Sequence, residues 1–200
     1  MIKNRFIKTS AVLVFVLSAA ACGNNRNVAQ SQNAAGTISG TGAGNSVATS
    51  KALANISNTK NDTTGSGKAE FTSKSDGSVD LMLRVTFPKM ANKSVAVHLH
   101  EHGDCSDSGK GAHGHWNPTK ENHGKWGSSA YHSGDIGNIE LDAKGKGQIK
   151  LNSKRWTIGG DEKTNILNRA VIVHSGVDDY MTQPTGNAGS RIGCGIITTN

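Results

Sequence analysis

The chain has 200 residues, of which 34% are hydrophobic and 4% aromatic, and its formal net charge is +7. This small apolar share excludes a large conventional core, and no apolar run reaches the roughly 20 residues that a membrane-spanning helix needs. The basic residues are not interleaved with aromatic ones in a patch, so we expect no nucleic-acid partner. The 25 glycines, 8 histidines and 3 cysteines instead indicate a small domain that disulfides or metals stabilise.

Residues 1–21 have the pattern of an export signal. Lys3, Arg5 and Lys8 precede an apolar run that ends in small residues directly before Cys22. This ending resembles the lipobox of bacterial lipoproteins, in which the cysteine receives a lipid and becomes the mature N-terminus. Cleavage near Ala21 without lipidation is the alternative. We expect a membrane anchor at Cys22 and export to the cell envelope, with the periplasm or outer membrane favoured, where disulfides form.

Residues 22–50, after the export signal, are mostly small and polar, which predicts a flexible tether ahead of a folded domain over 51–200. Alternating apolar residues and turn signals predict strands in that domain. The expected strands are Gly67–Lys74, Ser78–Phe87, Ser94–Glu101, Lys146–Leu151, Arg169–His174 and Gly193–Thr198. Residues 103–141 are rich in Gly, His and Asn, and we expect one long functional loop there, organised by something other than apolar packing.

Histidines are the most informative residues of the chain. In the stretch VAVHLHEHGDC, alternation along a strand places His98, His100 and His102 on one face and Glu101 on the other. Two imidazoles on one strand face can bind a metal ion, although such pairs are also common on solvated faces. Further candidate ligands follow, namely His113, His115, His123, His132, Asp135 and His174. Imidazole suits copper, zinc, iron and nickel, and a carboxylate completes a zinc tetrahedron, so we expect a metal centre.

Five motifs in this order resemble the copper,zinc superoxide dismutase family from about Ser50 to the C-terminus. They are HLHEHGDC, GHWNP, HSGDIGNI, VIVH followed by VDD, and GNAGSRIGCG. The resemblance implies an all-β Greek-key barrel or sandwich, immunoglobulin-like in architecture, with long metal-binding and electrostatic loops. It also implies dismutation of superoxide to oxygen and hydrogen peroxide with one copper and one zinc ion per subunit, protecting the envelope from extracytoplasmic superoxide. A homodimer is the candidate assembly, although the strand pattern by itself identifies no interface.

The resemblance also implies roles for individual residues. It assigns copper to His98, His100, His115 and His174, and zinc to His115, His123, His132 and Asp135, with His115 bridging the two metals. Arg191 and His115 are implied as the catalytic residues, with Arg191 attracting superoxide beside the copper. Cys105 and Cys194 are implied as a disulfide. Asp178 is implied to link a copper histidine to a zinc histidine, and the neighbouring Asp179 is the alternative.

The sequence also contains lysines that could steer the superoxide anion to the site, and histidines that would serve an alternative function. Residues 175–190 contain no Lys, Arg or Glu, so Lys110, Lys120 or Lys125 are the candidates for steering the anion. The alternative function is a non-catalytic periplasmic protein that binds or delivers copper or zinc, with His102 and His113 as additional ligands. In either case metals and a disulfide are expected to contribute strongly to stability.

Overall fold

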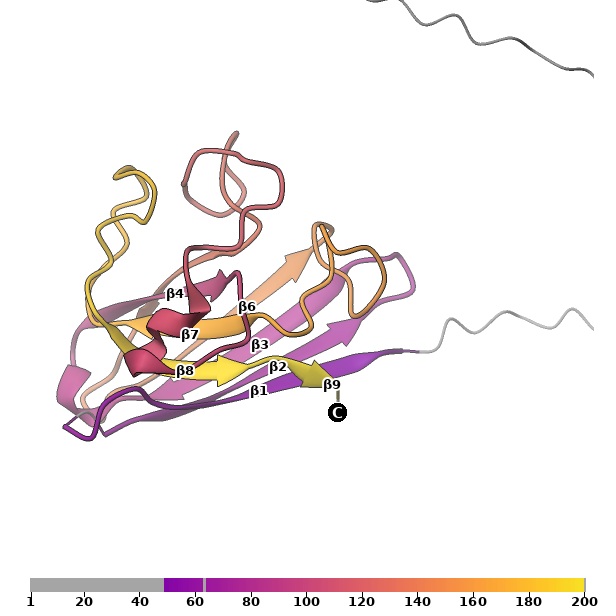
Figure 1. The fold of residues 1–200 in the computed structure, drawn as a ribbon. Coiled ribbons are helices and arrows are strands. Elements are labelled where there is room, and N and C mark those ends of the chain that lie inside the picture. The colour runs from indigo at the N-terminus through magenta and orange to yellow at the C-terminus, as the bar shows by residue number, and fades with distance from the viewer. Residues whose placement is uncertain (1–48, 63, 200) are drawn as a thin grey trace, which may run out of the picture. The chain divides into compact units, whose positions relative to one another are not determined.

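Antiparallel strands form the framework of the protein in the computed structural model, which describes residues 49–62 and 64–199 (Figure 1). The strands are β1 (Lys51–Asn58), β2 (Ser66–Ser73), β3 (Val79–Thr86), β4 (Ser94–His100), β5 (Asp135–Glu140), β6 (Lys146–Ser153), β7 (Ala170–His174), β8 (Arg191–Ile196) and β9 (Thr198–Thr199). Two short 3-10 helices, η1 (Pro88–Met90) and η2 (Asp107–Ala112), interrupt the connections. No helix in the described part is long and apolar enough to cross a membrane. The expected signal segment, Cys22 and residues 23–48 of the tether lie outside the described residues.

The strands form one sheet that nearly closes on itself. Its order is β5-β4-β7-β8-β1-β2-β3-β6, with β9 paired to β1, and the two end strands β5 and β6 contact each other. The steps from β4 to β7 and from β8 to β1 join strands that are distant in sequence, as Greek-key connections do. The expected all-β Greek-key barrel is confirmed.

Burial that alternates from one residue to the next explains why the expected strands form. On β3, the inward residues Val79, Leu81, Leu83 and Val85 are buried, and the residues between them are more exposed. On β7 every residue is buried, because loops cover the outer face of this strand where it carries His174. All six expected strands are present, with boundaries shifted by three residues or fewer.

Three strands and the extent of the long loop differ from expectation. β1 has the right alternation, but two of its buried residues, Ala52 and Ala54, are too small to give a strong apolar signal. β5 lies inside the segment expected to be loop. It forms because Ile136 and Ile139 are buried and because it pairs with β4 across a bulge that sets Asp135 opposite His98. The short β9 was also not expected.

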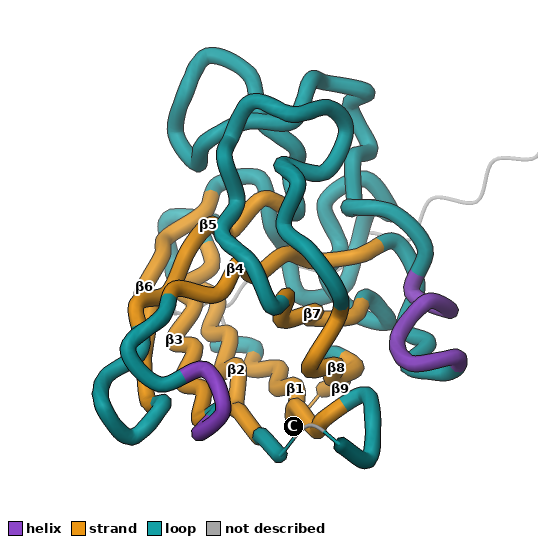
Figure 2. Tube along the Cα trace, turned by 90° about the vertical axis from the view of Figure 1, so that its left-hand side faces the viewer, coloured by secondary structure: helices purple, strands orange, loops and turns teal. Residues whose placement is uncertain are grey.

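Two long connections rise from the same side of the barrel, loop L1 (residues 101–134) and loop L2 (residues 175–190) (Figures 1 and 2). L1 is held partly by apolar packing, which corrects the expectation. Trp116 is buried in the main core, and Trp126 packs against Trp156 with ring centroids 5.2 Å apart. The indole N–H of Trp156 also donates to the carbonyl oxygen of Ser133, at 2.7 Å.

Candidate metal centre

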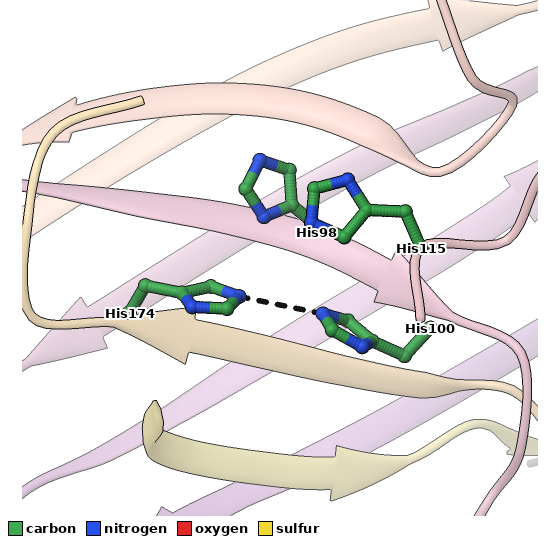
Figure 3. A group of neighbouring side chains, drawn as sticks. All are labelled: His98, His100, His115 and His174. Carbon is green, nitrogen blue, oxygen red and sulfur yellow. Dashed lines mark hydrogen bonds between the residues drawn. The ribbon is translucent and has the colours of Figure 1, made fainter. Parts of the chain in front are cut away.

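Three different parts of the fold bring four histidines together. β4 carries His98 and His100, L1 carries His115, and His174 is the last residue of β7. An isolated bridge pairs His100 with His115, and β4 lies next to β7 in the sheet. All four residues are buried, and their ligating atoms lie within 4.8 Å of one another (Figure 3). The structure therefore gathers the four expected copper ligands.

Hydrogen bonds determine which nitrogen of His100 and His174 carries a lone pair. Nδ1 of His100 donates to the carbonyl oxygen of His113 at 2.8 Å, and Nδ1 of His174 donates to that of Gly189 at 3.3 Å. Because a neutral imidazole has one proton, rings that donate through Nδ1 keep a lone pair on Nε2, and in these tautomers the two Nε2 atoms joined by the dashed line in Figure 3, 3.3 Å apart, both present lone pairs. Two facing lone pairs repel each other, and a cation between them removes that repulsion.

The other two rings complete the set. Nε2 of His98 donates to Asp178 at 2.9 Å, and Nδ1 of His115 donates to Asp135 at 3.0 Å. The remaining nitrogens, Nδ1 of His98 and Nε2 of His115, are buried without a hydrogen-bond partner among the described residues. Buried polar atoms without a partner are rare, and these two nitrogens fit a site that binds a ligand.

Burial keeps these imidazoles neutral. It lowers the pKa of His115 to about 4, and it lowers the pKa values of the other three rings below their ordinary range. Neutral rings with convergent lone pairs are the form that binds a metal. Four nitrogen donors suit tetragonal copper(II), so this set fits copper.

A second buried set shares His115 with the first. It contains His115, His123, His132 and Asp135, again with ligating atoms within 4.8 Å of one another. Nδ1 of His123 and Nδ1 of His132 lie 3.0 and 3.3 Å from the Asp135 carboxylate, but neither has hydrogen-bond geometry. Three imidazoles and one carboxylate are a donor set that tetrahedral zinc prefers, so this set fits zinc.

Asp178 joins the two sets. Its carboxylate accepts from Nε2 of His98 at 2.9 Å and from Nε2 of His123 at 2.8 Å, and its side chain is fully buried. Asp179, the sequence alternative, is exposed and accepts from backbone N–H groups of L2 instead. The structure therefore places Asp178, and not Asp179, between the rings.

The carboxylates of Asp135 and Asp178 set the charge of the second buried set of ligands. Burial by itself lowers the pKa of His123, but Asp135 and Asp178 more than offset this effect and raise it to about 9. Burial also opposes ionisation of the two acids. The hydrogen bond from His115 and the close rings of His123 and His132 nevertheless hold the pKa of Asp135 well below its usual range. Hydrogen bonds from His123 and His98 do the same for the pKa of Asp178. Without a metal, His123 therefore carries a proton that a zinc ion must displace.

Comparisons with known proteins agree with this geometry. Residues 65–197 match the family model described as copper/zinc superoxide dismutase (SODC). The chain belongs to the copper/zinc superoxide dismutase family. It is 34% identical over 151 residues to superoxide dismutase (Cu-Zn) 2 of Aquifex aeolicus (strain VF5), covering 74% of this chain and 86% of that protein. It is 34% identical over 138 residues to the extracellular superoxide dismutase (Cu-Zn) of Haemonchus contortus, covering 62% and 74%. It also resembles the crystal structure of the clock protein EA4, with a TM-score of 0.65, 31% identity, and coverage of 76% of this chain and 95% of that one.

In this copper/zinc superoxide dismutase fold, a cavity of about 360 Å³ opens beside the first set of histidines. It is lined by His100, His115, His174, Thr185, Asn187, Ala188, Gly189 and Arg191. The Arg191 guanidinium donates to the carbonyl oxygens of Gly109 and His113, which fix its position. The expected disulfide between Cys105 and Cys194 is present, and it ties the start of L1 to β8, the strand that begins at Arg191.

Two amide side chains that the sequence analysis did not single out hold this arrangement together. Asn138 on β5 accepts from the backbone N–H of Asp178 at 2.8 Å and donates to its carbonyl oxygen at 2.9 Å. Gln183 in L2 does the same for His123, at 2.8 and 3.0 Å. Asn138 lies within the motif HSGDIGNI, but the sequence carries no signal that distinguishes Gln183.

Gly186 in L2 is a further residue that the arrangement around Asp178 requires. Its φ of +63° favours glycine, and a Cβ atom there would lie 1.9 Å from the Asp178 carboxylate and 2.6 Å from Nε2 of His123. The first glycine of GNAGSR is therefore required by close approach to the Asp178 link.

Proposed function

We propose that this protein is a superoxide dismutase that converts superoxide to dioxygen and hydrogen peroxide in the cell envelope. Copper would be held by His98, His100, His115 and His174, and zinc by His115, His123, His132 and Asp135, one ion of each per chain. The observation that carries this proposal is the convergence of four neutral imidazole lone pairs beside a cavity that a fixed guanidinium also lines.

Copper, when bound, supplies one-electron oxidation and reduction, and zinc supplies fixed charge without redox chemistry. The residues of the chain supply capture, orientation and proton handling. Arg191 is always charged and presents a planar set of donors, two of which are anchored on carbonyl oxygens. It attracts the superoxide anion and orients it in the cavity beside His115.

His115 and Asp178 have distinct tasks in this proposal. The Nε2 atom of His115 belongs to a cavity-lining ring and can take up a proton and return it, whereas Nδ1 lies on the side of Asp135, among the proposed zinc ligands. Asp178 orients His98 and His123 through their outer nitrogens, as carboxylates beside metal ligands commonly do.

Lysines outside the cavity are the proposed steering charges. Lys125 lies over the Tyr180 ring, 5.9 Å from its centroid, and so stands beside L2. Lys110 lies 3.5 Å from Asp107, which partly neutralises its charge. Lys125 is therefore a stronger candidate than Lys110, and Lys120 is exposed on L1.

An envelope location is part of the proposal. The disulfide is a bond that persists in oxidising compartments, and the Haemonchus relative is named as extracellular. Cys22, with the pattern of a lipidation site, is proposed to anchor the chain to the membrane. Delivery of copper or zinc from the two buried sets is less well supported, because delivery requires exchangeable ligands and these ligands are buried.

The decisive experiment measures superoxide removal by protein loaded with both metals and by protein loaded with zinc alone. We expect turnover only with copper. Arg191→Gln should lower kcat/KM by about tenfold or more at low salt and weaken its salt dependence, because one positive charge leaves the cavity. Arg84→Gln on β3 is the matched control and should change neither. Tight binding of both metals without copper-dependent turnover would overturn the proposal.

A further inference from the structure

A third group of candidate ligands lies outside both buried sets. The ligating atoms of Glu101, His102 and His113 lie within 4.8 Å of one another. Both histidines are exposed and Glu101 is half-buried, so the group is open to solvent. We propose that these three side chains bind an additional, exchangeable Zn²⁺ ion on the surface of the protein.

The backbone builds this group as a continuation of the buried site. Beyond the bridge between His100 and His115, the N–H of Glu101 donates to the carbonyl oxygen of Gly114 at 3.1 Å. The N–H of His102 donates to the carbonyl oxygen of Ala112 at 3.2 Å. The segments that carry His102 and His113 are therefore held together by hydrogen bonds. Their position does not depend on a metal.

The side chains converge because β4 ends at His100. Strict alternation would send Glu101 to the face opposite His102, but residues 101–103 form a bend, and the carboxylate comes within reach of both rings. The rings of His102 and His113 are nearly perpendicular, at 89°, with centroids 4.6 Å apart. The expectation that Glu101 and His102 lie on opposite faces is thus wrong at this point.

The donor atoms have no competing protein partner in the described part of the chain. Within residues 49–62 and 64–199, no hydrogen bond or ion pair engages the ring nitrogens of His102 and His113 or the carboxylate of Glu101. Arg169, the neighbouring cation, donates to the backbone carbonyl of Glu101 at 2.6 Å and lies over the Trp116 ring; its charge also attracts the Glu101 carboxylate, but the two side chains form no ion pair at contact distance. The three donors are therefore available to a ligand.

The chemistry of the donors favours a borderline ion such as Zn²⁺ over the hard ions Ca²⁺ and Mg²⁺. Two imidazoles and one carboxylate suit Zn²⁺, whereas Ca²⁺ and Mg²⁺ prefer sets made of oxygen atoms. Three protein ligands leave the remaining position to water, and exposure lets the ion exchange. The carboxylate of Asp104 lies within electrostatic range of both rings and adds negative charge.

The proposed surface site shares backbone with the buried centre but no ligand. The carbonyl oxygen of His113 accepts from the His100 ring and from Arg191, while the His113 ring belongs to the surface group. The proposal therefore stands whether or not the protein turns over superoxide. It also dictates the choice of variants, because a change at His113 must leave its backbone in place.

His102→Gln removes one ligand at an exposed position. His113→Gly removes the other, and glycine tolerates the backbone there, with φ 61° and ψ −140°. Glu162→Gln is the matched control, because Glu162 lines the same surface cavity as Glu101 and His102 but belongs to no histidine group.

The test uses the full chain already loaded with copper and zinc. Equilibrium dialysis against Zn²⁺ measures the zinc bound per chain, and electron paramagnetic resonance of the copper checks that the buried set is unchanged. We expect one further saturable Zn²⁺ per chain, which excess Mg²⁺ does not displace. Each histidine variant should weaken this binding by about tenfold or more, and Glu162→Gln should not.

Two results would overturn the proposal. One is the absence of a saturable further equivalent of Zn²⁺ in the loaded protein. The other is binding in His102→Gln that equals the wild type. If His113→Gly disturbs the copper signal, His102→Gln alone decides the question. Failure of the buried sites to support turnover would leave the dialysis result unaffected, so the two proposals fail separately.

Discussion

Replacing Asp178 by asparagine tests the link between the two buried ligand sets. The substitution keeps the size of the side chain and removes its charge. In the wild type, both carboxylate oxygens accept from imidazole N–H groups, at 2.9 Å from His98 and 2.8 Å from His123. In the variant, the amide oxygen accepts from one ring, and the amide NH2 faces an N–H of the other ring. One charge-assisted hydrogen bond is therefore lost.

The size of the effect follows from that count. A hydrogen bond to a charged group contributes about 1.5–3 kcal/mol to stability. Because the carboxylate orients both rings for the metal, and because about 1.4 kcal/mol corresponds to a factor of ten, we expect the loss of one such bond to lower metal affinity by about 10- to 100-fold. Carboxylates that orient metal-binding histidines have effects of this size when they are replaced. Since Asp178 contacts one ring from each set, we expect the affinity for zinc and for copper to fall.

Competition against chelators of known affinity measures both dissociation constants. Asp179→Asn is the matched control, because it removes the same charge one position along the chain, where the side chain is exposed and binds only within L2. Its metal affinities should stay within about twofold of the wild type. The reasoning is refuted if Asp178→Asn binds both metals as tightly as the wild type, or if Asp179→Asn weakens binding equally.

Two further predictions concern stability. Replacing both Cys105 and Cys194 by serine should lower the free energy of unfolding of the metal-free protein by about 4–5 kcal/mol, because the bond spans 89 positions and restricts the unfolded chain; chemical denaturation measures this. Metal-free protein should also be most stable near neutral pH, as thermal unfolding over a pH series measures. The folded pKa of His123, about 9, exceeds its unfolded value near 6.5, so its contribution is complete below pH 6.5 and is lost as pH rises through 9. The folded pKa of His115, about 4, lies below 6.5, so its contribution is present above pH 6.5 and is lost as pH falls through 4.

Clear outcomes would contradict these two predictions. A serine variant that unfolds at nearly the denaturant concentration of the disulfide-bonded protein would show that the 89-residue loop matters little. A metal-free protein whose melting temperature is flat between pH 6.5 and 9 would show that His123 is not stabilised as a cation. Loading with zinc should remove the alkaline slope, because the metal replaces the proton on that ring.

Much of the fold follows from local pattern, and the exceptions have identifiable causes. β3 and β7 are predictable because large apolar residues recur at strand spacing. One face of a sheet must be buried, and these residues supply that face. β1 was missed because Ala52 and Ala54 contribute little apolar area, although they are buried. β5 was missed because its pairing with β4 depends on a bulge, and a bulge is a tertiary contact rather than a local preference.

The residues of the candidate site were likewise only partly predictable from the sequence. The residue types and the motif order were enough to name both ligand sets, the arginine and the cysteine pair. They did not reveal Gln183, whose amide clamps the backbone of His123 from 60 positions away. They also left Asp178 and Asp179 as alternatives, and burial of only the first decided between them.

Residue identity and spacing were sufficient to indicate the family, the barrel class and the side chains that can hold metals. Which nitrogen of each histidine is free depends on contacts in the folded chain, since the proton on His98 is placed by a carboxylate 80 positions away. The tertiary structure also decided that Glu101 joins His102 and His113, because a bend after β4 cancels the alternation that the sequence implies. Proton placement and side-chain convergence are set by contacts between distant segments, and no local pattern contains them.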